Sequence, residues 1–135
     1  MLYKEMTQKI IQAFYKVNNI LGYGFLEKVY ENAMAIELRK LGFLVLQQKN
    51  IKVYYDNYEV GDYFADILVN NLIILEIKAL KSLCNEHEAQ LINYLKATQI
   101  EVRLLFNFGK NAEFKRKIYT NDRKFHYNRN LQSIP

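Results

Sequence analysis

The sequence contains very little cysteine, proline and glycine, and these shortages exclude several classes of protein. Its 135 residues include one cysteine, one proline and five glycines, and no tryptophan. Cys84 alone cannot form an internal disulfide, so nothing indicates an oxidising compartment. Because the one proline is Pro135 and the glycines are scattered, no linker rich in these residues divides the chain. We therefore expect a single domain over residues 1–135.

Long apolar runs are also missing. No apolar stretch approaches the ~20 residues that a membrane-spanning helix needs. The charged pair Lys4-Glu5 comes too early for a secretory signal. Hydrophobic residues make up 50% of the chain and charged residues 24%, which is typical of globular domains and excludes a disordered chain. These features predict a cytoplasmic protein.

Positive charge is concentrated in the C-terminal third of the chain. The formal net charge is +5. Residues 102–135 contain eight Lys and Arg against two acidic residues, a net charge of +6, so residues 1–101 carry −1. A basic segment at about residues 110–135 is typical of proteins that bind nucleic acid, although a solvated basic tail has the same composition. The residues that we expect to contact the phosphate backbone are Lys115, Arg116, Lys117, Arg123 and Lys124.

The spacing of apolar residues predicts an α/β domain with a mixed sheet. Two amphipathic helices are expected at residues 3–20 and 25–41, with Gly42 ending the second. The apolar arc of the second helix is expected to contain Leu26, Val29, Tyr30, Ala33 and Leu41. A third helix is expected at residues 85–98. Strands are expected at residues 43–48, 51–55, 58–69, 72–80 and 101–108, with a hairpin turn at Asp56-Asn57. A strand, a helix and a second strand at the end of this order predict a parallel crossover.

Three charged residues interrupt strands that we expect to be buried. Asp66 lies in one of these strands, and Glu76 and Lys78 lie in the next. Charged side chains are rarely buried unless they are paired or bind a ligand. Glu76 and Lys78 project from the same face because they are two residues apart. A three-residue loop at residues 70–72 would place Asp66 opposite Glu76 on that face, whereas a two-residue loop would place it opposite Leu75.

Two carboxylates and one ammonium group on a strand face suit a site for a hard cation. Carboxylate oxygens are typical ligands of Mg²⁺ or Mn²⁺, which retain waters and accept phosphate oxygens of a substrate. Such a cation activates a water, and Lys78 would position that water or stabilise charge in the transition state. The alternative is a structural ion pair between Lys78 and either Asp66 or Glu76.

Two of the expected helices add polar side chains. Gln90 and Tyr94 place an amide and a phenol one turn apart on the third helix, over the strand that carries Glu76. The alternative is an ordinary half-buried tyrosine beside a solvated glutamine. Glu27 lies at the flank of the apolar arc of the second helix and faces either a cleft or solvent. Glu37 lies nearer the centre of that arc, where we expect a buried ion pair with a basic side chain.

The positions of these residues resemble the motif of the PD-(D/E)XK nuclease superfamily. The residues that carry the resemblance are Asp66, Glu76-x-Lys78 and Gln90-x-x-x-Tyr94. Ala65 stands where the name of the superfamily has proline, a position that varies in the superfamily.

A second motif is similar to a narrower family. Gly24-Phe-Leu-Glu27-Lys-Val-Tyr30 resembles the Gly-x-x-Glu-x-x-Tyr signature of the GxxExxY proteins, a small bacterial family within the superfamily. The similarity covers about residues 10–119, which is most of the chain.

This resemblance implies a restriction-endonuclease-like fold, an α-β-β-β-α-β core preceded by one extra helix. It implies divalent-metal-dependent cleavage of the phosphodiester bonds of nucleic acid, with Mg²⁺ or Mn²⁺ as the cation and DNA as the expected substrate. The roles that it implies are metal binding by Asp66 and Glu76, catalysis by Lys78, and support from Glu27, Gln90 and Tyr94. The alternatives on the same fold are a non-catalytic nucleic-acid-binding module and a protein-interaction subunit, which acts as a homodimer or in a larger DNA-processing complex.

Overall fold

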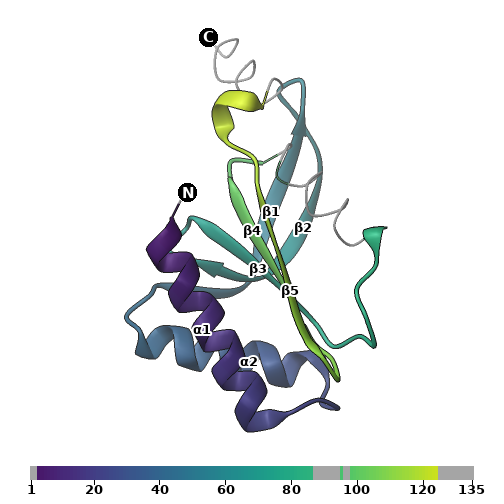
Figure 1. Cartoon of the computed structure of the whole chain (residues 1–135). Coiled ribbons are helices and arrows are strands. Elements are labelled where there is room, and N and C mark those ends of the chain that lie inside the picture. Colours follow the sequence, from purple (N-terminus) through teal and green to yellow (C-terminus); the bar gives the residue numbers. More distant parts are fainter. Residues whose placement is uncertain (1–2, 87–94, 96–97, 125–135) are drawn as a thin grey trace.

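The computed structural model describes residues 3–86, 95 and 98–124 of the chain, and Figure 1 shows their arrangement. The five described strands form one mixed sheet in the order β1-β2-β3-β4-β5, in which only β3 and β4 run parallel. The elements are α1 (Lys4–Leu21), α2 (Glu27–Lys40), β1 (Val45–Tyr55), β2 (Tyr58–Val69), β3 (Ile73–Lys78), β4 (Val102–Phe108), β5 (Ala112–Ile118) and the 3-10 helix η1 (Asn121–Arg123). The predicted α/β class and mixed sheet are confirmed.

Helices α1 and α2 pack against each other and cover one face of the sheet (Figure 1). α1 buries Ile10, Phe14 and Val17, which recur at helical spacing as expected. The ring of Phe14 stacks on Phe106 of β4 with centroids 4.5 Å apart. Full burial of side chains of this size stabilises the fold by about 1.5–3 kcal/mol each. The amphipathic pattern of α1 therefore fixes this helix on the sheet.

The buried face of α2 differs from the expected one. We expected Leu26 and Val29 on the apolar arc, but Leu26 is 80% exposed and Val29 is also exposed. The helix begins at Glu27, so Leu26 is the capping residue and does not lie on a helical turn. The buried arc is formed by Tyr30, Glu31, Met34, Ala35 and Leu38. This rotation brings a carboxylate, that of Glu31, against the sheet.

β1 and β2 form a long antiparallel ribbon. The two strands expected at residues 43–48 and 51–55 are one strand, and Gln48, with φ of +53°, locally interrupts its pairing with β2. The predicted turn at Asp56-Asn57 is confirmed. Both turn residues have positive φ, which the tightest hairpin turns require.

The register between β2 and β3 is the one that brings the charged residues together. Val69 pairs with Ile73 and Ile67 with Leu75, so residues 70–72 form the three-residue loop. Asn70 and Asn71 both have positive φ, a conformation that asparagine tolerates better than most residues. Continued by one residue, this register places Asp66 opposite Glu76.

The segment after Gly109 is a strand that the sequence did not predict. β5 pairs antiparallel with β4 at the edge of the sheet. Lys115 and Lys117 pair with Leu105 and Arg103, whereas Arg116 pairs with Leu104 on the face of the helices. The basic run is therefore divided between the two faces of the sheet. Among the described residues, no helix is both long and apolar enough to span a bilayer.

Candidate active site

The candidate site lies where β2 and β3 stop pairing. The two strands share only three residue pairs, and the last of these is Ile67 with Leu75. One residue further along, the backbone amide of Ile77 donates a hydrogen bond to Asp66 Oδ2 over 2.7 Å. This amide belongs to the residue between Glu76 and Lys78, so the Asp66 carboxylate lies beside both. All three charged side chains are half-buried.

Alternation along β3 separates the site from the core under the helices. Ile73, Leu75 and Ile77 belong to the core with α1 and α2. Glu76 and Lys78 project from the opposite face, with Ile74, which packs in a smaller apolar cluster. The charged side chains of β3 therefore lie on this second face of the sheet and not in the core under the helices.

A buried arginine, which the sequence reasoning missed, contacts the site. Arg103 on β4 is 2% exposed, and its Nη2 donates a hydrogen bond to Glu76 Oε1. Its guanidinium also lies over the ring of Tyr63, with Cζ 5.1 Å from the ring centroid. Arg103 pairs with Ile74 in the parallel register, so it shares the face of Glu76. The only sequence signal was an arginine inside an apolar strand, the same signal that identified Asp66 and Glu76.

The environment of Glu76 shifts its protonation towards neutral pH. Burial raises the pKa of Glu76 to about 7 from its ordinary value of 4.5, and repulsion by Asp66 contributes to the rise. The positive charges of Arg103 and Lys78 oppose the rise. Near pH 7, therefore, Glu76 is protonated in a large share of the metal-free molecules.

The donors in this site fit a divalent cation of the Mg²⁺ type. Within residues 3–86, 95 and 98–124 there is no cluster of three or more His, Cys, Asp or Glu that would enclose a metal. Mg²⁺ does not need one, because it is usually held by one or two carboxylates and keeps several waters for exchange with phosphate oxygens. A cation beside Asp66 and Glu76 would also offset their repulsion and replace the proton on Glu76.

A second carboxylate from α2 is connected to Asp66. Glu31 is 3% exposed, and its two oxygens accept hydrogen bonds from Gln47 and Gln48, each over 2.7 Å. Gln48 Nε2 also lies 3.3 Å from Asp66 Oδ1, so this amide bridges the two carboxylates. Lys28 Nζ lies 3.0 Å from Glu31 Oε2. Sequence reasoning missed Glu31 because it placed the apolar arc of α2 too close to the start of the helix.

The other expected residues of the two helices have different outcomes. Glu27 is exposed, at the first position of α2. Glu37 forms an ion pair with a basic side chain, its Oε1 2.8 Å from Lys16 Nζ, but the pair lies at the surface and is not buried as expected. Gln90 and Tyr94 lie outside the described residues.

The chain that follows Lys78 is held in place by β4. Asn107, which pairs with Lys78 in the register, is fully buried. Its amide accepts a hydrogen bond from the Leu80 N–H over 2.8 Å and donates one to the Leu80 carbonyl over 3.0 Å. A Cβ on Gly109 would lie 2.5 Å from the same carbonyl oxygen, so this position needs glycine. Asn107 and Gly109 thereby fix where β3 ends.

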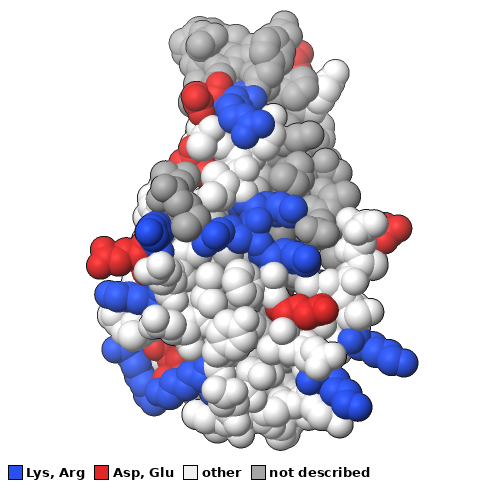
Figure 2. Space-filling model, viewed as in Figure 1, with Lys and Arg blue, Asp and Glu red and all other residues white. Residues whose placement is uncertain are grey.

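The basic residues near the site are not equivalent. Lys115 is exposed and Lys117 is half-buried, and both lie on the face of Glu76. Figure 2 shows Lys and Arg side chains gathered across the middle of the visible face, in the region where β5 lies in Figure 1. Arg123 is exposed and places its guanidinium 4.6 Å from the centre of the Tyr119 ring.

Lys124 differs from the expectation that it contacts phosphate. Its side chain is buried, and Nζ donates hydrogen bonds to the carbonyl oxygens of Thr98 and Ile100 over 2.9 and 2.6 Å. Burial lowers the pKa of Lys124 to about 8, and Glu101 partly opposes the change. Lys124 therefore ties the end of the described chain to the start of β4 and does not present its charge to solvent.

An α/β domain with this charged face at the β2–β3 opening has the architecture of a restriction-endonuclease-like nuclease. Residues 4–118 match the model of the PD-(D/E)XK nuclease superfamily, and the chain belongs to that superfamily. The crystal structure of SSO0001 has a similar fold, with a TM-score of 0.52 and 17% identity over 95% of this chain. The chain spans 65% of the length of SSO0001, and at this identity the likeness shows the fold alone. Comparison with curated proteins finds no match.

Proposed function

We propose that this chain is a divalent-metal-dependent nuclease that hydrolyses the phosphodiester bonds of DNA. The observation that carries the proposal is the hydrogen bond from the Ile77 amide to Asp66, which holds that carboxylate beside Glu76 and Lys78. Membership of the PD-(D/E)XK superfamily supports nuclease activity and nucleic-acid binding. The Gly24, Glu27 and Tyr30 motif further supports a place among the GxxExxY proteins.

Asp66 and Glu76 are the residues that would hold Mg²⁺ or Mn²⁺. When bound, the cation supplies a Lewis acid that activates water and neutralises charge at the phosphorus centre. Because Glu76 has a pKa of about 7 without metal, its binding to a cation would release a proton near neutral pH. The contact with Arg103 holds the Glu76 side chain on the face of the site.

Lys78 is the proposed catalytic residue. It projects from the same face of β3 as Glu76, and its neighbour in the register, Asn107, fixes the following segment. An ammonium group in this place can orient the attacking water or stabilise the charge that develops on the phosphate oxygens. Glu27, Gln90 and Tyr94 remain the supporting set that the motif implies.

Glu31 extends that set as a positioning residue. It does not contact the cation ligands directly but holds Gln48, whose amide lies between Glu31 and Asp66. A buried carboxylate that accepts three hydrogen bonds is well suited to fix a neighbouring amide. Its proposed task is to orient the oxygen of Asp66 that does not bind the Ile77 amide.

The phosphate backbone of the substrate is the proposed partner of the basic side chains on β5 and beyond. Lys115 and Lys117 share the face of Glu76, and Arg123 is exposed near the end of the described chain. Contacts of this kind position a strand without reading its sequence.

A second candidate is a non-catalytic nucleic-acid-binding module on the same fold. One observation favours it: Glu76 is already paired with the buried Arg103, which is the form that a structural ion pair takes. Such a module would bind nucleic acid but would not cleave it in the presence of any divalent cation.

The deciding experiment incubates the protein with plasmid, linear and single-stranded DNA and with RNA, in Mg²⁺, Mn²⁺ or a chelator. We expect DNA to be cleaved only with a divalent cation. Cleavage should be strongly slowed in Lys78→Met and retained in Lys49→Met, a matched change of an exposed lysine on β1. Binding without cleavage in every metal would establish the second candidate. Equal cleavage by Lys78→Met would exclude this lysine from the chemistry.

A further inference from the structure

Three loops meet at the end of β3 and line an open cavity of about 360 Å³. Residues 23–25 come from the α1–α2 loop, residues 79–81 follow β3, and residues 108–110 begin the β4–β5 turn. Figure 1 shows these segments converging at the lower right of the molecule. The lining starts one residue after Lys78. Because an extended chain advances at most ~3.6 Å per residue, the Cα of Lys81 lies within about 11 Å of the Cα of Lys78. The cavity is therefore a neighbour of the candidate site.

The α1–α2 wall of the cavity is held in place by Tyr30. Its hydroxyl donates a hydrogen bond to the Gly22 carbonyl over 2.6 Å and accepts one from the Phe25 N–H over 3.2 Å. The Tyr30 ring stacks on Phe108 with centroids 4.3 Å apart and an angle of 11° between the planes. Gly24 has φ of +109°, which few other residues adopt. The opposite wall is fixed by the contacts of Leu80 with Asn107 and Gly109.

The chemistry of the lining combines aromatic rings with positive charge. Tyr23 is 61% exposed and Phe25 is 46% exposed, although both belong to a wall fixed by hydrogen bonds. Lys81 and Lys110 are exposed at the rim, and none of the lining residues is acidic. Aromatic faces beside lysines are the pattern with which proteins hold single-stranded nucleic acid, because a base stacks on the ring and a phosphate lies against the ammonium group.

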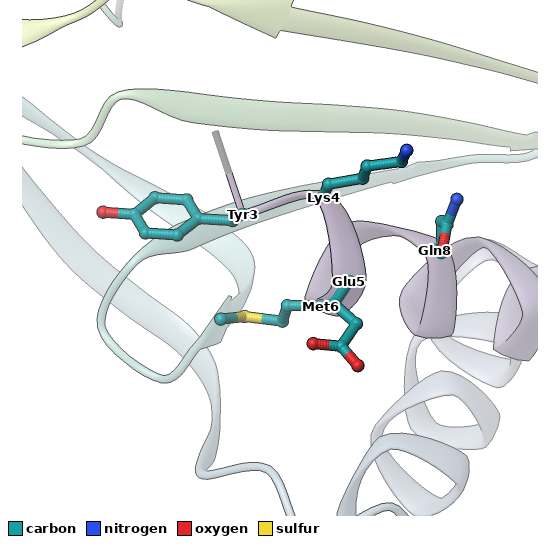
Figure 3. A pocket seen from close by; sticks show the side chains of 5 residues that line it. All are labelled: Tyr3, Lys4, Glu5, Met6 and Gln8. Carbon is teal, nitrogen blue, oxygen red and sulfur yellow. The ribbon is translucent and has the colours of Figure 1, made fainter. Parts of the chain in front are cut away.

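Two other cavities of the described chain lack this combination. The cavity at the start of α1 includes Glu5, and Figure 3 shows the Lys4 and Glu5 side chains pointing in different directions. The cavity beside β1 includes Lys52, whose ammonium group lies 3.1 Å from the carboxylate of Glu59.

We propose that the cavity lined by residues 23–25, 79–81 and 108–110 binds a nucleotide of an unpaired strand next to the bond that is cleaved. The base stacks on Tyr23 or Phe25, and the flanking phosphates contact Lys81 and Lys110. A paired base is already stacked in its duplex, so an exposed ring in a cavity selects an unpaired one. This assignment rests on the proposed nuclease function and adds that the substrate is unpaired, that is single-stranded, at this nucleotide.

The test measures binding apart from cleavage. Labelled single-stranded DNA, single-stranded RNA and duplex DNA are titrated with the protein in a chelator, and fluorescence anisotropy is recorded over a range of salt concentrations. The charge variant is Lys81→Gln/Lys110→Gln, and its matched control is Lys4→Gln/Lys9→Gln, two exposed lysines of α1. The aromatic variant is Tyr23→Ser, and its control is Tyr58→Ser at the tip of the hairpin, where the ring is 72% exposed.

We expect the charge variant to flatten the plot of log K against log[salt] by about 0.7 for each phosphate that its side chains no longer neutralise. Tyr23→Ser should weaken binding of a single strand by about fivefold or more, as removal of one stacking ring does. The DNA and RNA titrations show which single strand the cavity takes. Both controls should bind as the wild type does, and all variants should keep its melting temperature.

Wild-type affinity and salt slope in both cavity variants would overturn this inference and leave the nuclease proposal intact if the protein still cleaves DNA in Mg²⁺. Equal weakening of duplex and single-strand binding would refute the preference for an unpaired nucleotide. A wild-type protein that neither binds nor cleaves nucleic acid would instead refute the proposed function, and this inference with it.

Discussion

Replacing Glu76 by glutamine should change how the stability of the metal-free protein depends on pH. The side chain is 14% exposed, so solvent screens its interactions only weakly. Glutamine has nearly the same shape but does not titrate. The ion pair with Arg103 exists only while Glu76 is ionised, so its loss in the variant is already included in the pKa of Glu76. The remaining differences between the two side chains do not depend on pH.

The pH-dependent part follows from the pKa of Glu76. Burial raises this pKa from 4.5 to about 7, so the folded state binds the proton more tightly than the unfolded state does. The stabilisation is fully present below pH 4.5 and is lost as the pH rises through 7. The rise of the Glu76 pKa from 4.5 to about 7 corresponds to roughly 3 kcal/mol. Between pH 4.5 and pH 8 the wild type should therefore lose roughly 3 kcal/mol relative to Glu76→Gln.

The assay is thermal or urea unfolding of both proteins in a chelator at several pH values. The difference in melting temperature between them should change by roughly 10 °C over this range. Glu5→Gln, at an exposed position in the first turn of α1, is the control and should follow the wild type. Parallel curves for the wild type and Glu76→Gln would refute the burial argument for this carboxyl group.

Three further changes test other parts of the structure. Lys78→Met should keep metal and DNA binding but lower the single-turnover cleavage rate by roughly 10²–10⁴-fold, and a rate near that of the wild type would contradict its catalytic role. Lys115→Gln/Lys117→Gln should flatten the salt dependence of DNA binding by about 0.7–0.9 for each phosphate no longer neutralised, whereas Arg116→Gln, on the other face of the sheet, should leave it unchanged; equal effects would show that the face of β5 does not matter. Gly109→Ala should lower the free energy of unfolding by about 1–3 kcal/mol in urea titrations, because its Cβ would lie 2.5 Å from a carbonyl oxygen of the segment after β3. Unchanged stability in that variant would show that this segment can move.

The sequence predicted the central strands because the physical signals there are local. It left two registers between β2 and β3 open, and the structure has the one with the three-residue loop. Apolar runs marked β3 and β4 as buried, and Asn70-Asn71 indicated a turn that tolerates positive φ. Burying a charged side chain costs free energy, so charged residues in apolar strands indicated a site at Asp66 and Glu76 before the fold was known.

Other features depend on contacts that no local pattern contains. β5 has the sequence of a basic tail, and it becomes a strand only because the edge of β4 offers it a backbone partner. Glu31 has the sequence context of a solvated helix residue, and only the packing of α2 on the sheet places it against Gln47 and Gln48. Lys124 is buried through carbonyl groups more than twenty residues away in the chain, a long-range contact that charge counting cannot detect.

The most direct measurement of the central claim, that Asp66 and Glu76 form a divalent-metal site, is the shift in melting temperature that Mn²⁺ produces. The wild type and Asp62→Asn, a change of an exposed carboxylate on the same strand, should both be stabilised as Mn²⁺ is added, because binding to the folded state alone raises its stability. Asp66→Asn should show no such shift, and the wild-type shift should be larger at pH 8 than at pH 5.5, where a proton competes for Glu76. An equal Mn²⁺ shift in Asp66→Asn, or none in the wild type, would contradict the metal site.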